Sequence, residues 1–259
     1  MKKAYLLHSR PYRETSALID LFTEDSRWVR LVVKGINRNG KSAQQMRGVL
    51  QPFSPLLCEW RGRSELKSLR SVESSGLAFA FKDKVLYSAI YINELLTKLL
   101  PKIEPDELLF QKYEMTLLAL SKRTMSTSDQ TDKEADLRAI AIALRDFEFH
   151  MLDSLGYGID FENDAVSGEK ILGGSHYSFE RDRGFVKLGN SVSAEDAQLL
   201  EPASRRRPSK RFFLGQDIHA IADRNWDSAR ALSSAKLLSR QAFDQLLGGV
   251  ELDSRKLFR

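Results

Sequence analysis

The chain has 259 residues, enough for one large domain or two modest ones whose cores need no disulfide. Its single cysteine, Cys58, excludes an intrachain disulfide and a metal site made of several cysteines. There is no run of about 18 uncharged apolar residues and no secretory-type apolar stretch at the start, so we expect a cytoplasmic protein without a membrane span.

The net charge of +5 is concentrated in the first third of the sequence. Residues 1–80 contain fourteen Lys and Arg against seven Asp and Glu, a surplus of +7, whereas residues 81–259 carry −2. A segment in which one sign dominates attracts partners of the opposite sign. The asymmetry therefore predicts that the first third binds a polyanion.

Residues 1–80 also have the pattern of short β-strands. Runs rich in Leu, Val and Ile alternate in part with polar residues and are separated by turn signals. The expected strands are residues 4–10, 16–23, 28–35, 55–62 and 66–74. Five strands in about 75 residues predict a small barrel. Within it, Cys58 is expected to be a small buried residue rather than a reactive thiol, because no cation adjoins it in the sequence.

Between the third and fourth expected strands lies a long segment without an acidic residue, which we expect to be a basic loop. In the third strand, Trp28, Arg30 and Lys34 share one parity, which predicts a face both basic and aromatic. Proteins that hold nucleic-acid strands combine cations for the phosphates with aromatic rings that stack on bases. The candidate nucleic-acid-binding residues are Lys34, Arg38, Lys41, Arg47, Arg61, Arg63, Lys67, Arg70, Tyr12 and Trp28. Trp60 is a further candidate for stacking, and for each tryptophan the alternative is a place in the barrel core.

From residue 81 the apolar residues recur at helical spacing. Helices are expected at residues 85–101, 107–122 and 136–155, with Pro101 and Pro105 marking the break between the first two. Residues 159–190 are short and punctuated by glycines, and residues 176–188 predict a β-hairpin that turns at Arg183 and Gly184. Two more helices are expected near 193–200 and 228–247, with a basic run at 201–211 between them.

The helix expected at 136–155 carries a second apolar row that contains one cation. Its members are Ile142, Arg145, Phe149 and Leu152. One interpretation is a helix buried on nearly all sides, with Arg145 paired to Asp146 or Glu148. The other is a partner-binding site in which Arg145, Phe149 and Leu152 receive a peptide with an apolar end and a terminal carboxylate.

The sequence carries none of the common nucleotide-binding, hydrolase or zinc-protease motifs. Its histidines, His8, His150, His176 and His219, are not at metal-ligand spacing from one another. We therefore expect no catalytic site and no metal.

Several stretches together resemble the bacterial RecO family of DNA repair and recombination mediators. They are "AYLLHSRPYRETSALIDLFTED", "VRLVVKG", "LQPFSPLL", "WRGRSELKSLRSVES", "LYSAIYINELL", "LDSLGYGIDF" and "LGGVELDSRKLFR", so the resemblance extends from about residue 4 to the C-terminus. It implies an α+β chain with an N-terminal five-stranded OB-fold barrel, residues 1–80. A mainly helical domain, residues 81–259, would follow, with a small zinc-finger-like β-hairpin insert at about 159–190.

The resemblance also implies a function. Members of the family bind single- and double-stranded DNA, anneal strands coated by single-stranded DNA-binding protein (SSB), and with RecR assist RecA loading at gaps. They are not enzymes, and a monomer associated with the bacterial nucleoid is expected. The basic segments Lys34 to Arg47 and Arg61 to Arg70 would contact DNA. The SSB tail would dock on the stretch that holds Arg145, which favours the partner-binding interpretation of that row.

One departure from the family pattern concerns the insert. Many relatives hold zinc there with four cysteines, whereas residues 163–177 contain none. Ser167 and Asp164 cannot replace thiolates in a soft tetrahedral site. We therefore predict a zinc-less insert held by packing and hairpin hydrogen bonds. We also predict that the protein has no cofactor. The basic residues at 205–211 have no assigned role. An RNA-binding OB-fold protein and a protein-interaction scaffold remain alternatives to the DNA mediator.

Overall fold

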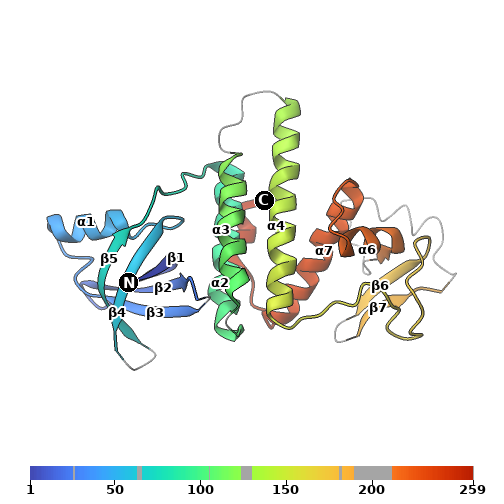
Figure 1. Ribbon diagram of the computed structural model, residues 1–259, viewed down its shortest axis with the longest axis horizontal. Coiled ribbons are helices and arrows are strands. Elements are labelled where there is room, and N and C mark those ends of the chain that lie inside the picture. Colours follow the sequence, from blue (N-terminus) through green and yellow to red (C-terminus); the bar gives the residue numbers. More distant parts are fainter. Residues whose placement is uncertain are drawn as a thin grey trace. The chain divides into compact units, whose positions relative to one another are not determined.

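The computed structural model of the protein describes residues 1–25, 27–62, 66–104, 106–123, 130–180, 183–189 and 212–258. The chain forms two compact units, residues 1–155 with 250–259, and residues 156–249 (Figure 1). The fold class is α+β, as predicted, with a barrel followed by a helical region. The predicted helix near 193–200, the basic run 201–211 and Arg63 lie outside the described residues.

The first unit begins with a closed five-stranded barrel. Its strands are β1 (Lys2–Tyr12), β2 (Ser16–Thr23), β3 (Trp28–Val33), β4 (Pro55–Arg61) and β5 (Lys67–Ser74). They follow the order β1-β2-β3-β5-β4, and a parallel pairing of β3 with β5 closes the barrel. A helix between β3 and β4 completes the OB-fold. The predicted five-stranded barrel is confirmed.

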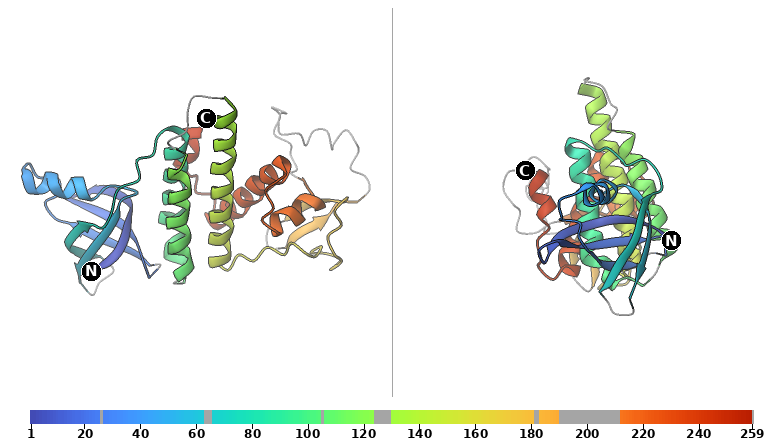
Figure 2. Two further views of the ribbon diagram at one scale, coloured as in Figure 1. Left: turned by 45° about the horizontal axis from the view of Figure 1, so that its top comes forward. Right: turned by 90° about the vertical axis from the view of Figure 1, so that its left-hand side faces the viewer.

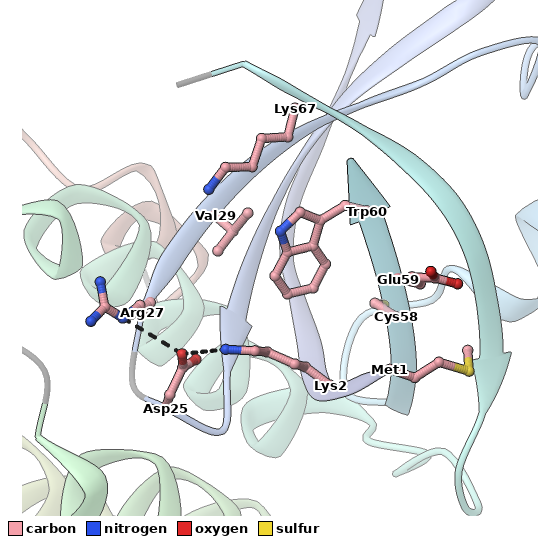
Figure 3. Close-up of a pocket in the computed structure, with 9 residues that line it drawn as sticks. All are labelled: Met1, Lys2, Asp25, Arg27, Val29, Cys58, Glu59, Trp60 and Lys67. Carbon is pink, nitrogen blue, oxygen red and sulfur yellow. Dashed lines mark hydrogen bonds and ion pairs between the residues drawn. The ribbon is translucent and has the colours of Figure 1, made fainter. Parts of the chain in front are cut away.

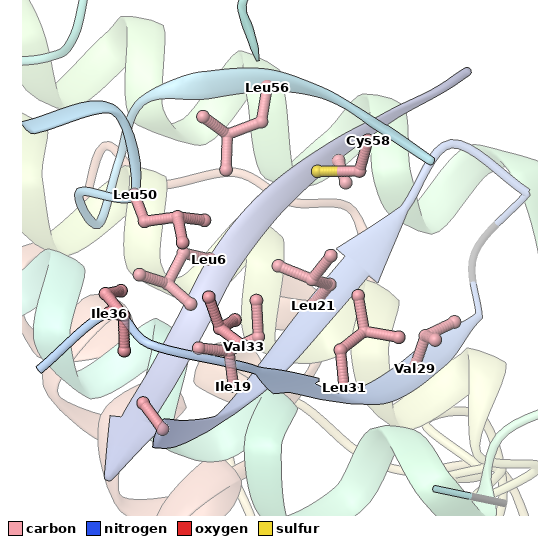
Figure 4. Close-up of a cluster of buried hydrophobic side chains, with 12 residues drawn as sticks. Leu6, Ile19, Leu21, Val29, Leu31, Val33, Ile36, Leu50, Leu56 and Cys58 are labelled. Atoms are coloured by element: carbon pink, nitrogen blue, oxygen red, sulfur yellow. The ribbon is translucent and has the colours of Figure 1, made fainter. Parts of the chain in front are cut away.

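The barrel interior is filled by one face of each strand (Figure 4). In β3, Val29, Leu31 and Val33 are buried, while Trp28, Arg30 and Val32 on the other parity are only partly covered. Leu21 and Leu31 are fully buried, and each such side chain stabilises the fold by about 1.5–3 kcal/mol. Cys58 is also fully inside, and burial raises the pKa of its thiol to about 12. This confirms its expected place in the core.

The segment expected to be a loop contains a helix, α1 (Lys41–Val49). The expectation of a continuous loop from Lys34 to Arg47 was therefore wrong. The stretch "KSAQQMR" consists mostly of residues with good helix propensity, which was the available signal. The stretch shows no stripe of apolar residues at helical spacing, and in α1 only Ala43 is buried. Gly35, with φ of +73°, makes the turn between β3 and α1.

The helical part of the first unit contains three long helices whose apolar residues face one another. They are α2 (Asp83–Leu99), α3 (Glu107–Ser121) and α4 (Gln130–Ser154), and the short helices η1 (Leu100–Lys102) and η2 (Asp253–Phe258) accompany them. All three long helices were predicted, and α4 begins earlier than its expected start near Asp136. Both carboxylate oxygens of Glu94 on α2 accept hydrogen bonds from the start of η2, which attaches the C-terminal segment to α2.

A buried amide joins the barrel to these helices. Asn93 on α2 donates from Nδ2 to the carbonyl oxygens of Leu6 and Leu7, at 3.3 and 3.4 Å, where a bulge interrupts the pairing of β1 with β2. Its Oδ1 accepts from the Tyr113 hydroxyl of α3 at 2.7 Å. Around this point Tyr5 and Phe22 of the barrel pack edge-on or tilted against Phe110 and Tyr113. The helices therefore cover the face of β1 and β2 that carries Tyr5 and Phe22.

In its described residues, the second unit contains a three-stranded sheet and two helices. Its elements are β6 (His176–Glu180), β7 (Gly184–Lys187), β8 (Phe212–Leu214), α6 (Gly215–Ala222) and α7 (Ala229–Leu246). The predicted hairpin and the helix near 228–247 are confirmed, whereas β8 and α6 were not predicted. At Gly215 an added Cβ would lie 2.0 Å from the carbonyl oxygen of Leu172, so only glycine fits between these segments.

In the predicted insert, one buried carboxylate organises the chain. Asp164 accepts hydrogen bonds from the backbone N–H groups of Val166, Ser167 and Lys187 and from the Ser167 hydroxyl. It thereby ties the turn at 164–168 to β7. Burial alone would raise the pKa of this carboxyl, but the bonds from Ser167 and Lys187 outweigh burial and lower the pKa. The insert thus has the packing and hydrogen bonds expected of it. The absence of a metal from the insert stays a prediction.

We expect Asp164→Ala to lower the unfolding free energy of the 156–249 unit by about 2–4 kcal/mol, because several buried donors lose their acceptor. The lowered pKa means that the native carboxylate contributes stability above the ordinary carboxyl pKa. This contribution is lost as the pH falls through the lowered native value, so the cost of the variant shrinks in acid. Urea unfolding followed by Trp226 fluorescence, in chains with Trp28 and Trp60 replaced by Phe, measures it.

Asp160→Ala is the matched control for this variant. Asp160 also accepts from two backbone N–H groups, those of Glu162 and Asn163, but it is exposed. Its removal should cost less than about 1 kcal/mol. Equal costs for the two variants would contradict the role assigned to Asp164.

Candidate nucleic-acid interface

The segment between β3 and the end of α1 carries exposed cations. Lys34, Arg38 and Lys41 are exposed, and none of them forms an ion pair with a residue that the structure describes. Arg47 is exposed too, but its guanidinium donates to the backbone carbonyls of Ile36 and Arg38. Three of the four predicted cations are therefore available to a ligand, and Arg47 instead holds the turn that presents them.

This turn adjoins the β1–β2 hairpin and forms a hollow with it. Asn37 donates from its backbone to the carbonyl oxygen of Thr15 and from its side chain to that of Ser16, at 3.0 and 2.9 Å. The hollow between the two turns has a volume of about 610 Å³. Residues that line it include Tyr12, Arg13, Val32, Lys34 and Arg38. We call this site the turn hollow.

The turn hollow combines one aromatic ring with three cations. The guanidinium of Arg13 lies over the Tyr12 ring at 5.1 Å from the centroid, a cation–π arrangement that holds both side chains. Glu14 is the one acidic side chain of the lining. Tyr12, Lys34 and Arg38 were predicted site residues that the fold does bring together. Arg13 was missed, although its place in the turn signal before the second strand was visible in the sequence.

The outward face of β3 is less basic than its sequence indicates. Arg30 donates to both carboxylate oxygens of Asp20 on β2, at 2.7 and 3.0 Å, and Asp20 is almost fully buried. These hydrogen bonds raise the pKa of the Arg30 guanidinium. The same guanidinium lies 4.6 Å from the Trp28 ring centroid and covers that ring. Trp28 and Arg30 do share one partly covered face of β3, as predicted, but a cross-strand ion pair with Asp20 uses the charge of Arg30.

The second predicted basic segment, Arg61 to Arg70, contains both a cation that is paired with a carboxylate and cations that are not paired within the described part of the chain. Arg70 on β5 forms an ion pair with Glu59 on β4 at 2.9 Å. Arg61 is exposed, and neither it nor Lys67 has an ion pair within the described part of the chain. Lys67 and Trp60 line a second hollow, of about 500 Å³, beside the start of β3 (Figure 3). This site, the mouth hollow, shares no lining residue with the turn hollow.

The predicted partner-binding residues on α4 are buried. Arg145 is 5 % exposed and donates to Glu148 at 2.6 Å, while Phe149 and Leu152 are each 1 % exposed. Tyr91 donates to the same Glu148 oxygen at 2.8 Å, and burial raises the pKa of its hydroxyl. The structure thus contains the ion pair with Glu148 of the first interpretation. Among the described residues, Arg145 Nε and Glu148 Oε2 have no hydrogen-bond partner although both atoms are buried.

The described ranges contain no group of three or more His, Cys, Asp or Glu side chains arranged to hold a metal ion. Of the helices described, none combines the length and the apolar character needed to cross a bilayer.

The sequence is similar to known proteins along nearly its whole length. The family model "Recombination protein O N terminal" matches residues 1–77, and "Recombination protein O C terminal" matches residues 84–256. The DNA repair protein RecO of Serratia proteamaculans is 36% identical over 258 residues, which is 100% of this chain and 93% of the relative. Proteins of the same name from Pectobacterium atrosepticum and Erwinia tasmaniensis are 36% and 37% identical, each with 100% of this chain and 92% of the relative covered.

We expect Arg30→Ala to destabilise the protein by about 2–4 kcal/mol, because it leaves the buried Asp20 carboxylate without its bidentate partner. Lys34→Ala, at an exposed and unpaired position, should stay within about 0.5 kcal/mol of wild type. The double variant Arg30→Gln with Asp20→Asn restores a neutral pair and should recover part of the loss. Thermal unfolding compares the variants, and equal melting temperatures for the two single changes would refute this assignment.

Proposed function

We propose that this chain, a member of the recombination protein O (RecO) family, acts as a DNA-binding mediator and not as an enzyme. Membership of the family gives it a role in DNA repair and recombination. It binds single- and double-stranded DNA, anneals complementary strands coated by SSB, and with RecR assists RecA loading at gaps. It works as a cytoplasmic, nucleoid-associated monomer. Residues 1–80 are its DNA-binding domain and residues 81–259 its partner-binding domain.

The observation that carries this proposal is that Lys34, Arg38 and Lys41 are exposed and form no ion pair with any residue that the structure describes. Cations already paired with carboxylates gain little from a phosphate, whereas unpaired exposed cations release counterions from the DNA when they bind it. Two views show α1, which begins at Lys41, on the side of the barrel away from α2 and α3 (Figures 1 and 2). A long polyanion can therefore approach the segment without meeting the helices.

The backbone supports the same site. Gly40 precedes α1 and offers no side chain to accept from the first N–H groups, and the first turn of α1 contains no acidic residue. A helix N-terminus carries partial positive charge and binds phosphate through such N–H groups. Together with Lys41 and Arg38, this end of α1 presents both charge and directed donors to a phosphate. The exposed Arg61 and the unpaired Lys67 would extend the contact along the barrel.

The proposed partner site is the α4 row, Arg145, Phe149 and Leu152. Its support is the unused hydrogen-bonding capacity at Arg145 Nε, beside an apolar wall, where a terminal carboxylate of the SSB tail would find a cation. Since the row is buried, a docking peptide must displace side chains that cover it. Glu148 would then have to share Arg145 with the peptide carboxylate.

Reversing Lys34, Arg38 and Lys41 to Glu should abolish oligonucleotide binding while the melting temperature stays near wild type. For the wild type, if about five or six phosphates are contacted, log affinity should fall against log salt with a slope of roughly −3.5 to −4 for single strands. Fluorescence anisotropy with a labelled oligonucleotide measures both quantities.

The control for this reversal carries the same charge change elsewhere. Lys84, Lys122 and Lys133 are exposed on or beside the helices, and changing them to Glu should leave most of the affinity. A flat salt dependence, or equal losses in both triple variants, would contradict the proposed site. Competition with RNA of the same sequence separates the RNA-binding alternative, and a complete lack of affinity for protein-free oligonucleotide would indicate the scaffold alternative.

For the α4 row we expect Arg145→Gln combined with Glu148→Gln to weaken binding of an SSB-tail peptide at least tenfold and to leave affinity for bare DNA within twofold. The double change avoids leaving Glu148 buried without its cation. A peptide with an amidated C-terminus tests the contact itself. Wild type should bind it more weakly than the acid, whereas the variant should bind both alike. A variant that still prefers the acid would place the peptide elsewhere.

A further inference from the structure

The mouth hollow has an aromatic and uncharged floor. Val29 and Cys58 are buried beneath it, and Trp60 packs against the barrel core while also lining the hollow (Figure 3). Burial keeps the Cys58 thiol protonated, since its pKa is raised to about 12. The register of β4 with β5 shifts at this point, because Arg70 of β5 is an extra residue between the pairs Glu59 with Ser71 and Trp60 with Leu69. Trp60 has the same parity along β4 as the buried Cys58, so its indole lies at the barrel end and lines the hollow.

The rim of the mouth hollow carries a local excess of positive charge. Lys2 and Arg27 share one carboxylate, Asp25, at 2.6 and 3.5 Å, so one positive charge of this group is left over. The other acid of the lining, Glu59, is paired with Arg70. Lys67 lies beside the hollow without an ion pair among the described residues. The site therefore offers a ring face and surplus cations within one hollow.

This combination matches one unit of a single-stranded nucleic acid. A planar base can lie on the indole face, and the phosphates on either side of it can meet the cations of the rim. A hollow of about 500 Å³ is in the range of sites that enclose small organic groups. In a duplex, each base is covered on both faces by its neighbours and is not free to enter. A hollow of this kind can distinguish an unpaired base from a paired one, whereas the exposed cations Lys34, Arg38 and Lys41 attract the phosphates of either.

We infer that the mouth hollow is a base-binding subsite that distinguishes single-stranded from double-stranded nucleic acid, with Trp60 as its stacking residue. The inference rests on the proposed function and adds to it a division of labour. Lys34, Arg38 and Lys41 supply charge that any strand can use, and Trp60 supplies the contact that only an unpaired strand can use.

The test compares Trp60→Leu with Trp60→Phe, which keeps an aromatic ring. Trp60→Leu should weaken binding of a single-stranded oligothymidylate roughly tenfold at fixed salt, the usual effect of losing one stacked base. Its affinity for a duplex should stay within twofold, which also shows that the barrel is folded. Trp60→Phe should remain close to wild type for both. Equal effects of Trp60→Leu on single strand and duplex, or none on either, would overturn the inference.

An oligonucleotide that carries abasic positions provides a second measurement that needs no folded variant at position 60. Wild type should bind it more weakly than oligothymidylate, although the number of phosphates is the same. Fluorescence of Trp60, in a chain with Trp28→Phe and Trp226→Phe, should be quenched by oligothymidylate and not by the duplex. Equal binding of abasic and normal strands, or unquenched Trp60, would overturn the subsite while leaving DNA binding intact. Failure of wild type to bind any oligonucleotide would instead reject the proposed function itself.

Discussion

The buried amide of Asn93 fixes how the barrel meets the helices, and the available surface follows from it. An amide hydrogen bond is directional, so contacts to the Leu6 and Leu7 carbonyls and to Tyr113 set a geometry that aromatic packing alone would leave looser. Losing this side chain would leave two carbonyls and a hydroxyl unpaired in a buried place. Because β1 and β2 are attached to α2 and α3 here, β3, the β1–β2 turn and α1 are left for a ligand.

Within that free surface, ion pairs decide which cations can act. Asp20 neutralises Arg30, Glu59 neutralises Arg70, and Asp25 is shared by Lys2 and Arg27. A surplus of positive charge in the sequence is therefore not a uniformly positive surface. What remains is local, at the turn hollow and at the mouth hollow, and each has its own aromatic ring. Because the two hollows share no lining residue, each can be changed by mutation without the other, although both belong to one barrel of about 75 residues.

The second unit shows how a small sheet can be organised around a carboxylate. Asp164 gathers donors from a turn and from β7, so that one side chain connects segments distant in sequence. A buried carboxylate surrounded by N–H groups is stable as an anion and orders the backbone that supplies them. Gly215 adds a close approach of two backbones. These directed contacts act together with the burial of Tyr177, Phe185 and Phe213, one from each strand of the sheet.

The sequence alone determined the five strands, the three long helices of the first unit and the hairpin at 176–188, because side-chain period and turn residues act over short distances. It also located the excess of positive charge. Only the tertiary structure decided that Arg30 and Arg70 are neutralised and that Tyr12, Arg13, Lys34 and Arg38 share one hollow, since these contacts depend on which strands pair and in what register. Helix α1 was not predicted for a different reason: only Ala43 of this helix is buried, so its sequence shows no apolar stripe at helical spacing.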